Sequence, residues 1–259
     1  MKITSLLENT TEREDMQVEH GLSLYIETGS SRILFDMGQT DLFYENARAL
    51  GIDLSGVDIA VLSHGHYDHG GGLRKFLEIN HHALVYIHKD AFLPHYNGTE
   101  KYIGLDPSLK DYVQIVFTDD ECRINDSLTL FSCNGREKNH PTIPSGLTEK
   151  VGNVFVPDDF RHEQYLLIQE NGKQILISGC SHKGILDIVD WFKPDVLIGG
   201  FHYSKLPLDE ALAGAAGSLA AHPTAFYTCH CTGCEQYEFM RQYMPSLYYL
   251  SCGQTISIS

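Results

Sequence analysis

Four side chains of types that commonly bind metal ions lie within one six-residue stretch, His64-Gly65-His66-Tyr67-Asp68-His69. Because His64 and His66 alternate around a glycine, their imidazoles can face the same way, and Asp68 and His69 can reach an adjacent position. Two imidazoles on one ion, with a carboxylate and an imidazole on its neighbour, form a two-metal hydrolytic centre. The stretch therefore predicts a pair of metal ions rather than a polar loop with scattered histidines.

The elements that must position this stretch follow from the hydropathy pattern. The apolar run Ile59–Leu62 predicts a buried strand that delivers the ligands, and Gly70–Gly72 lets the backbone turn sharply after them. The same signals predict other elements of the first half. Strands are expected at Leu22–Glu27, Arg32–Asp36 and Leu84–Ile87, and helices at Asp41–Leu50 and Leu73–Ile79.

Strands and helices also follow one another in the second half. Asn171-Gly172 between two apolar runs predicts a hairpin. The pattern by itself indicates a mixed α and β fold. Strands are expected at Tyr165–Ile168, Gln174–Ile177, Val196–Ile198, Phe226–Thr228 and Ile256–Ile258, and helices at Gly184–Phe192, Leu208–Ala221 and Glu235–Tyr243.

The pattern loosens between about residues 89 and 157, where proline and glycine are frequent. Short strands are still expected at Val113–Phe117 and Leu128–Phe131. We interpret Phe92–Lys110 and Asn134–Pro157 as long loops over the site, because long loops in compact domains are usually functional. The alternative is that both are surface excursions without a role.

A two-metal centre needs about two more imidazoles and a bridging group, and strand ends are the expected source. His182, His202 and His230 each follow a predicted strand of the second half. His140 and His162 are intermediate candidates. Four histidines lie in a polar stretch and are expected at the surface: His81, His82, His88 and His95.

The stretch Ser63–Leu73 resembles the signature of the metallo-β-lactamase superfamily. Further segments are similar to the branch related to 7,8-dihydropterin-6-methyl-4-(β-D-ribofuranosyl)aminobenzene-5′-phosphate synthase, in order over nearly the whole chain. The resemblance implies one domain over residues 1–259 and an α+β fold, the four-layer αββα sandwich, with metals at one edge between the sheets. The further segments are Glu19–Ser23, Ile177–His182, Gly199–His202 and Cys229–Gly233.

Position at strand ends and the resemblance together imply roles outside the first stretch. His182 and His230 complete the metal site, whereas His202 lines the substrate pocket or lies behind the ligands. His20 approaches the cleft, where it can donate to a substrate oxyanion or phosphate; a capping turn is the alternative. Superfamily members usually carry a bridging aspartate where this chain has Cys180. Its thiolate can ligate zinc, or Cys180 is a small buried residue.

The other cysteines near the end of the chain do not predict a separate zinc site. Cys231 and Cys234 have CxxC spacing, but no second pair exists to complete four ligands. Thiols packed around His230 are the preferred interpretation. The seven cysteines are an odd number, and a disulfide framework fits poorly in a chain of this size.

Bulk properties exclude several classes of partner. The formal net charge is −15, with 34 acidic and 19 basic residues, which argues against a nucleic acid. No apolar run approaches the roughly 20 residues that span a bilayer, so no membrane partner is expected. Met1–Leu7 lacks the apolar segment of a secretory signal, and a cytoplasmic location is expected by default. The sequence indicates no particular oligomeric state.

The metal pair determines the expected chemistry. A divalent ion lowers the pKa of its bound water to about 7. Asp68 can bind metal or accept the proton of that water, and a second ion can stabilise charge on a carbonyl or phosphoryl oxygen. We therefore expect a metal-dependent hydrolase for a small phosphorylated, ester or heterocyclic substrate. Two divalent ions are expected, with zinc first and manganese or iron as alternatives.

Three other functions stay open. The branch name implies a transferase that joins a dihydropterin to an aminobenzene ribofuranosyl phosphate. An iron-dependent oxidoreductase on the same scaffold would give the thiols of Cys180 and Cys229 a larger part. A non-catalytic protein that senses a small ligand is the third, and the intact set of ligands in the first stretch argues against it.

Overall fold

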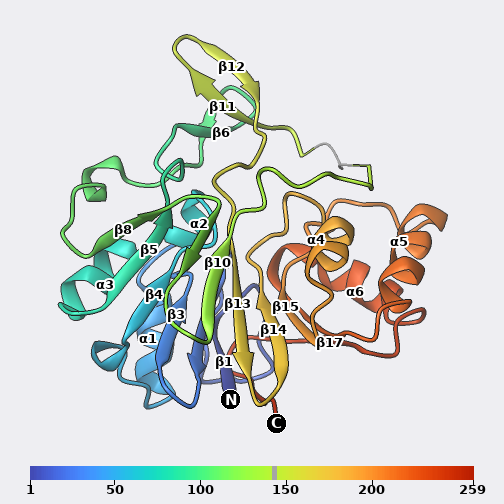
Figure 1. Cartoon of the computed structure of the whole chain (residues 1–259), viewed down its shortest axis with the longest axis horizontal. Coiled ribbons are helices and arrows are strands. Elements are labelled where there is room, and N and C mark those ends of the chain that lie inside the picture. Colours follow the sequence, from blue (N-terminus) through green and yellow to red (C-terminus); the bar gives the residue numbers. More distant parts are fainter. Residues whose placement is uncertain (142–144) are drawn as a thin grey trace.

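Two seven-stranded sheets form the centre of the molecule, which a computed structural model describes for residues 1–141 and 145–259 (Figure 1). The first sheet has the order β18-β1-β2-β3-β4-β5-β8. Its members β3, β4, β5 and β8 run parallel, and the others are antiparallel. In chain order the strands are β1 Lys2–Leu7, β2 Ser23–Glu27, β3 Arg32–Phe35, β4 Ile59–Val61, β5 Leu84–His88, β8 Ile115–Thr118 and β18 Thr255–Ser257.

The second sheet has the order β17-β16-β15-β14-β13-β10-β9. Strands β14 to β17 are parallel, and β9, β10, β13 and β14 form antiparallel pairs. The strands are β9 Glu121–Arg123, β10 Leu128–Phe131, β13 Tyr165–Glu170, β14 Lys173–Ile177, β15 Val196–Gly199, β16 Ala225–Thr228 and β17 Leu247–Tyr249.

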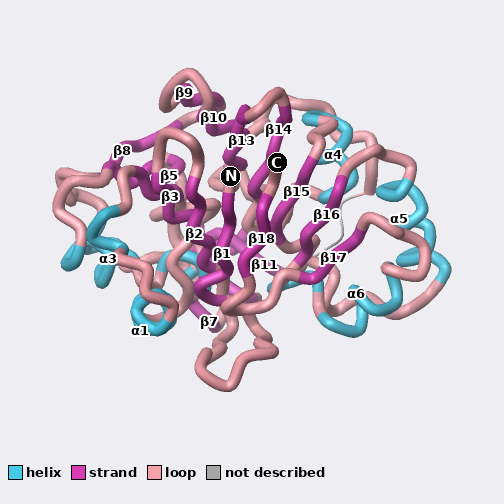
Figure 2. Tube along the Cα trace, turned by 90° about the horizontal axis from the view of Figure 1, so that it is seen from below, coloured by secondary structure: helices cyan, strands magenta, loops and turns pink. Residues whose placement is uncertain are grey.

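Helices cover the outer face of each sheet, as Figure 2 shows from below. On the first sheet lie α1 (Leu42–Ala49) and α3 (Leu73–Ile79), and on the second lie α4 (Ile185–Phe192), α5 (Glu210–Ala220) and α6 (Cys234–Met240). The short elements are α2 (Tyr67–Gly70) and the 3₁₀ turns η1 (Leu54–Gly56), η2 (Pro107–Leu109) and η3 (His230–Thr232).

Alternating side chains along the strands produce three separate cores. Ile175 and Ile177 of β14 face the first sheet, whereas Leu176 between them faces the helices of the second. On β3, Ile33 and Phe35 face inward and Leu34 packs under the helices of the first. Successive side chains of a strand point to opposite faces, so a sheet buried on both sides must be apolar at every position. The expected αββα sandwich is confirmed.

The interpretation of Phe92–Lys110 and Asn134–Pro157 as long loops was wrong in part. Both segments contain strands, which form a small sheet of order β12-β11-β6-β7 that projects from the sandwich (Figure 1). Its strands are β6 His95–Asn97, β7 Lys101–Tyr102, β11 Leu147–Val151 and β12 Val154–Pro157. Alternation over strands this short gives a weak signal. Residues 142–144 of the second segment lie outside the described residues.

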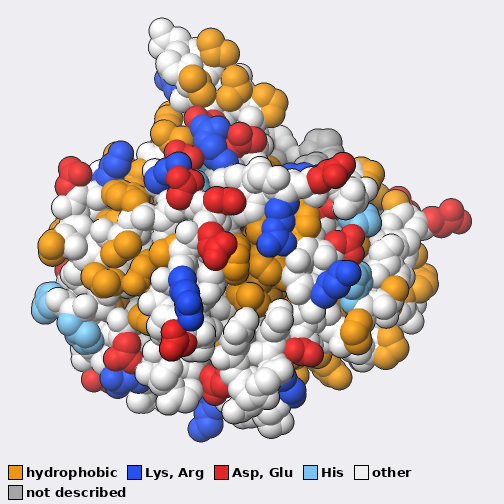
Figure 3. All heavy atoms as spheres, in the orientation of Figure 1, with side chains coloured by type: hydrophobic (Ala, Val, Ile, Leu, Met, Phe, Trp, Pro, Cys, Tyr) orange, Lys and Arg blue, Asp and Glu red, His pale blue; other side chains and the backbone are white. Residues whose placement is uncertain are grey.

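The projecting sheet carries exposed apolar side chains near its tip, visible in Figure 3. Val151 and Val154 are 54% and 62% exposed. Within the sandwich, β1, β9 and β17 were not predicted, and each predicted helix is within three residues of its observed ends. In the described residues, no helix is both long and apolar enough to cross a membrane.

Candidate metal centre

The predicted ligands converge because each follows the carboxyl end of a strand. The stretch of the first half follows β4 and enters α2, His182 follows β14, and His230 follows β16 in η3. Strand β4 is parallel to its neighbours in the first sheet, as β14 and β16 are to β15 in the second. Parallel strands bring their carboxyl ends to one edge, so both sheets present side chains to the same pocket.

The first stretch is held tightly against the rest of the first sheet. The Ser63 hydroxyl donates to Asp36 Oδ2 over 2.7 Å and accepts from His64 Nδ1 over 2.8 Å. His64 therefore carries its proton on Nδ1 and leaves the Nε2 lone pair free. A side chain at Gly65 would clash with the Ala91 carbonyl, which explains why glycine separates His64 from His66.

One set of ligand-type atoms comes from His64, His66 and His182. All three residues are buried, and His64 Nε2, His66 Nε2 and both ring nitrogens of His182 have no hydrogen-bond partner among the described residues. Buried polar groups without a partner are costly, and native proteins satisfy nearly all of them. Three imidazoles whose ligand atoms lie within 4.8 Å of one another fit a divalent metal ion.

A second set lies beside the first. Asp68 Oδ2 is 3.5 Å from His230 Nε2 and 3.8 Å from His69 Nε2. His69 Nδ1 donates to Asp36 Oδ2 over 2.7 Å, so Nε2 is the nitrogen that lies toward Asp68 and Cys180. A carboxylate and two imidazoles can hold a second ion next to the first.

Asn9 and Asp36 support these ligands, and the sequence analysis missed both. His230 Nδ1 donates to Asn9 Oδ1 over 2.8 Å, so its Nε2 points to Asp68. Asp36 does the same for His69. Partners of this kind fix the tautomer and orientation of a metal-binding histidine. Neither residue carried a usable signal in the sequence, because the strand before Asn9 was not predicted and Asp36 was predicted as the end of a strand.

Cys180 lies between the two sets. Its Sγ is 3.1 Å from His69 Nε2, and with His64 and His69 it forms another group of ligand-type atoms. It also belongs to a group with His202 and Cys231. Burial raises the pKa of the Cys180 thiol well above its ordinary value, and Cys231 adds to this shift. The thiol form is therefore favoured unless a cation lies close to the sulfur.

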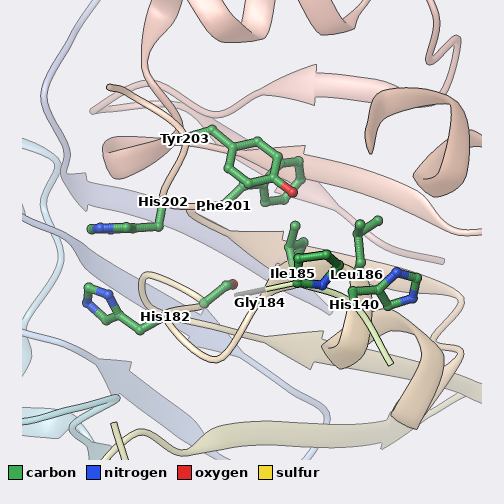
Figure 4. Close-up of a pocket in the computed structure, with 10 residues that line it drawn as sticks. His140, His182, Gly184, Ile185, Leu186, Phe201, His202 and Tyr203 are labelled. Carbon is green, nitrogen blue, oxygen red and sulfur yellow. The ribbon is translucent and has the colours of Figure 1, made fainter. Parts of the chain in front are cut away.

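The predicted substrate residues lie at the rim of the same pocket. His20 is exposed, and its Nε2 is 3.2 Å from Asp68 Oδ2. The ring of His202 lies 4.3 Å from that of His182, centroid to centroid, and both residues line the pocket of the metal centre. Both also line a neighbouring pocket, drawn in Figure 4, whose other walls include Ile185, Phe201 and Tyr203. The backbone N–H of His202 donates to Cys231 Sγ, which brings these two residues together.

The loop that carries His182 is fixed by a buried carboxylate. Glu163 accepts from the backbone N–H groups of His182 and Lys183 over 2.7 and 3.0 Å. Phe160 stacks on the His182 ring at 4.4 Å with an angle of 6° between the planes. The ring is therefore held from both its backbone and its face.

Left-handed backbone conformations gather around the pocket. Asp36, Ser181, His202 and His230 have φ between 49° and 60°, a region that non-glycine residues rarely adopt. Each such residue costs on the order of 1–3 kcal/mol and persists only where its surroundings impose it, often at functional sites.

The electrostatics of the two sets differ. Burial lowers the pKa of His64, His66 and His182 well below the ordinary value, and neighbouring histidines add to this effect. These residues are neutral, the form that binds metals. Burial would raise the pKa of Asp68, but His69, His20 and His230 bring it well below its ordinary value. Asp68 is therefore a carboxylate.

A pocket opens onto both sets, and the projecting sheet forms one of its walls. Asn97, Lys101, Ile103 and Leu147 line it opposite His20, Asp68 and His230. The segments Phe92–Lys110 and Asn134–Pro157 thus reach the site although they are not simple loops. Lys101 and Lys205 are the cations in this lining.

The expected surface positions of His88 and His95 were wrong. Both are buried, at 1% and 0% exposure, whereas His81 and His82 are exposed as predicted. His88 is the last residue of β5 and His95 the first of β6, so the polar character of the stretch did not decide their burial. His162 is also buried, and His140 is half-buried against Asp190.

Comparison with known proteins agrees with this geometry. The family model described as the metallo-beta-lactamase superfamily matches residues 16–213. The chain belongs to this superfamily. The solved structure of Tm1679, a metal-dependent hydrolase of the β-lactamase superfamily, superposes on this metallo-β-lactamase fold with a TM-score of 0.84. It is 28% identical, and the match covers 100% of this chain and 99% of that one.

Two curated relatives of this superfamily member come from Methanocaldococcus jannaschii. The uncharacterized protein MJ0448 is 32% identical over 242 residues, which cover 89% of this chain and 90% of the relative. The 7,8-dihydropterin-6-methyl-4-(beta-D-ribofuranosyl)-aminobenzene-5′-phosphate synthase is 28% identical over 265 residues, covering 92% of this chain and 90% of the relative. The resemblance seen in the sequence is confirmed.

Proposed function

We propose that this protein is a metal-dependent hydrolase with two metal ions, which acts on a small phosphorylated, ester or heterocyclic substrate. One ion would be held by His64, His66 and His182, and the other by Asp68, His69 and His230, with Cys180 between them: these are the ligands predicted from the sequence. The observation that carries the proposal is the convergence of unpartnered imidazole nitrogens and a carboxylate in one pocket.

The residues around the pocket divide the work of hydrolysis. Bound divalent ions supply Lewis acidity and lower the pKa of water. Asp68 is a carboxylate at the open side of the site, where it orients the attacking water and accepts its proton. His20 and His202 flank the pocket and donate hydrogen bonds to substrate oxygens. Phe160 and Glu163 prevent His182 from turning away.

Charge in the pocket supports a substrate that carries an anionic group. The chain has a net charge of −15, yet Lys101 and Lys205 line this pocket. Two divalent ions would add four positive charges beside the single carboxylate of Asp68. A phosphorylated small molecule would be attracted to such a site.

Metal analysis of the purified protein, together with its visible spectrum, is the first test. We expect two ions per chain, with zinc as the first candidate and manganese as an alternative. Iron, with an iron absorption band, would instead favour the oxidoreductase. A panel of chromogenic phosphodiesters, phosphomonoesters, esters and lactones then tests the hydrolase. No turnover of any class by metal-replete protein would contradict it.

A transferase is the second candidate, because the 28% identical relative is named as a synthase. The same metal pocket would bind the pyrophosphate leaving group of an activated dihydropterin while an aminobenzene ribofuranosyl phosphate attacks. Incubation of both substrates with metal-replete protein, followed by mass spectrometry, separates the two reactions. A condensation product without hydrolysis of the panel would replace the hydrolase proposal.

A further inference from the structure

A passage connects the metal pocket with the helices of the second sheet. It shares His182 and His202 with the pocket that contains the predicted metal ligands. Figure 4 shows Tyr203 on one side of this space and Ile185 and Leu186 on the other. These walls come from the start of α4 and from the residues that follow β15, so the passage leads away from the metal centre on the side of the second sheet.

The passage adjoins a larger space between α4 and α5, which we call the apolar recess. Leu186 and Tyr203 line both spaces. The recess has a volume of about 290 Å³. An apolar cavity of roughly 150 Å³ can hold benzene, so the recess has room for one or two fused rings. Its further lining includes Leu206, Pro207, Asp209, Ala211, Leu212 and Ala215.

The recess and the metal pocket differ in chemical character. Asp209 is the one charged side chain among the described residues that line the recess. Its Oδ1 accepts from the backbone N–H groups of Ala211 and Leu212 over 3.0 and 3.2 Å, so it caps α5. The metal pocket instead contains the predicted ligands together with Lys101 and Lys205. A ligand that fills both spaces must be polar or charged at one end and apolar at the other.

Hydrogen bonds hold the wall of the recess in place. The backbone N–H of Leu206 donates to the Tyr203 carbonyl over 2.8 Å, and the Leu206 carbonyl accepts from Gln236 Nε2 of α6 over 2.8 Å. The backbone N–H of Ser204 donates to the Cys231 carbonyl over 3.0 Å. The segment between β15 and α5 is thus attached to two neighbouring elements, as expected for a ligand site that is formed before the ligand binds.

We propose that the apolar recess is the subsite for a ring-bearing, apolar end of the substrate, whose other end is hydrolysed in the metal pocket. The part between the two ends lies in the passage beside His182 and His202. The substrate class thereby narrows to molecules in which an aromatic or similarly apolar group is joined to the group that is hydrolysed. This inference rests on the proposed function, since it takes the metal pocket as the site of the reaction.

Indole, a neutral two-ring compound, tests the recess without using the metal pocket. We expect saturable chemical-shift changes in the methyl groups of Leu206, Leu212 and Ala215 when indole is added to metal-loaded protein. Ala215→Phe fills the recess and should remove the changes at the two leucines. Ala220→Phe is the matched control, because Ala220 is exposed on the same helix and outside the lining. No saturable change in wild type would overturn the proposal.

Two phosphonates test whether the recess and the metal pocket act on one ligand. Methylphosphonate and 4-phenylbutylphosphonate share the anionic group, and only the second has a ring. Calorimetry of the metal-loaded protein should show about 10- to 100-fold tighter binding of the second, the size expected when one aromatic group is buried. A215F should abolish this difference and change the affinity for methylphosphonate less than about twofold. Equal affinities in wild type, or binding of neither compound, would overturn the subsite.

Ala211→Trp is the second variant if A215F does not fold, because Ala211 lines the recess and is exposed in the first turn of α5. It should reduce the preference for the phenylbutyl compound in the same way. Sedimentation tests another occupant: a wild-type dimer that A215F dissociates would assign the recess to a contact between copies and overturn the subsite.

The two proposals can fail separately. Wild type that holds two ions and turns over a substrate of the panel, without any preference for the phenylbutyl compound, defeats the subsite alone. Wild type that holds no ion and binds neither phosphonate defeats the proposed function as well.

Discussion

The first half of the chain supplies four pocket residues from one six-residue stretch, whereas the second half supplies its share from separate strand ends. His64, His66, Asp68 and His69 follow one strand, and their mutual positions depend on a single loop and a glycine. His182 and His230 lie 48 residues apart and meet only because β14 and β16 are parallel strands of the same sheet. Local geometry thus determines half of the pocket, and sheet topology determines the other.

The two halves also differ in how their ligands are supported. Asp36 and Ser63 hold the ligands of the first sheet through short hydrogen bonds within that sheet. His230 instead depends on Asn9, a residue 221 positions away that follows β1. His182 depends on the side chains of Phe160 and Glu163, near its own strand pair. Because their partners are distant in the sequence, the metal ligands of the second half should be more sensitive to remote substitutions.

The largest expected effect concerns the first half. Asp68→Asn keeps the shape and one oxygen but removes the charge, so we expect the hydrolytic rate to fall about 10²-fold or more. One ion should largely remain, since His64 and His66 are untouched. Rate and metal content are measured on the same preparation, with Asp126→Asn, a fully exposed carboxylate, as the control. A near-normal rate would show that Asp68 is only structural.

Single alanine substitutions test the second half. His182→Ala and His230→Ala should each remove about one ion per chain, because each ion would keep only two strong ligands. His202→Ala should retain both ions and weaken substrate binding instead. Metal content by mass spectrometry distinguishes the cases. Loss of metal from H202A alone would reverse the assignment of His202 and His182.

A smaller effect is expected for Asn9, a residue of the first half that holds the ligand His230 of the second half. Asn9→Ala removes the acceptor of His230 Nδ1–H, and we expect about tenfold weaker binding of one ion. The ion near His64 should be unaffected. Asn125→Ala, which alters a hairpin turn far from the pocket, is the control. Equal loss of both ions in N9A would indicate general destabilisation rather than a role for Asn9.

The smallest effect concerns the projecting sheet. Lys101→Ala should raise KM for a phosphorylated substrate about two- to fivefold, the size expected for one exposed charge, and leave kcat unchanged. KM for an uncharged ester should not move. Lys150→Ala, in the same small sheet but outside the pocket lining, is the matched control. Equal shifts in both variants would remove Lys101 from substrate recognition.

Most of the sandwich could be predicted from the sequence, because its strands are short apolar runs bounded by turns and its helices have clear ends. The projecting sheet could not, since β7 has two residues and β11 has a mixed burial pattern. The burial of a histidine could not be predicted from its neighbours in the sequence either. His95 lies among polar neighbours, yet it is fully buried, and Asp158 from a segment 63 positions away accepts a hydrogen bond from its Nδ1.

The sequence by itself determined the ligand types, their density after one strand and the family to which the chain belongs, since these depend on residues adjacent along the chain. Only the tertiary structure decided which distant residues support the pocket. Asn9, Asp36 and Asp158 carry no local signal, because a hydrogen-bond partner is selected by proximity in space. That proximity arises from the whole fold: Asn9 and Asp36 follow β1 and β3 of the first sheet, and Asp158 follows β12 of the projecting sheet.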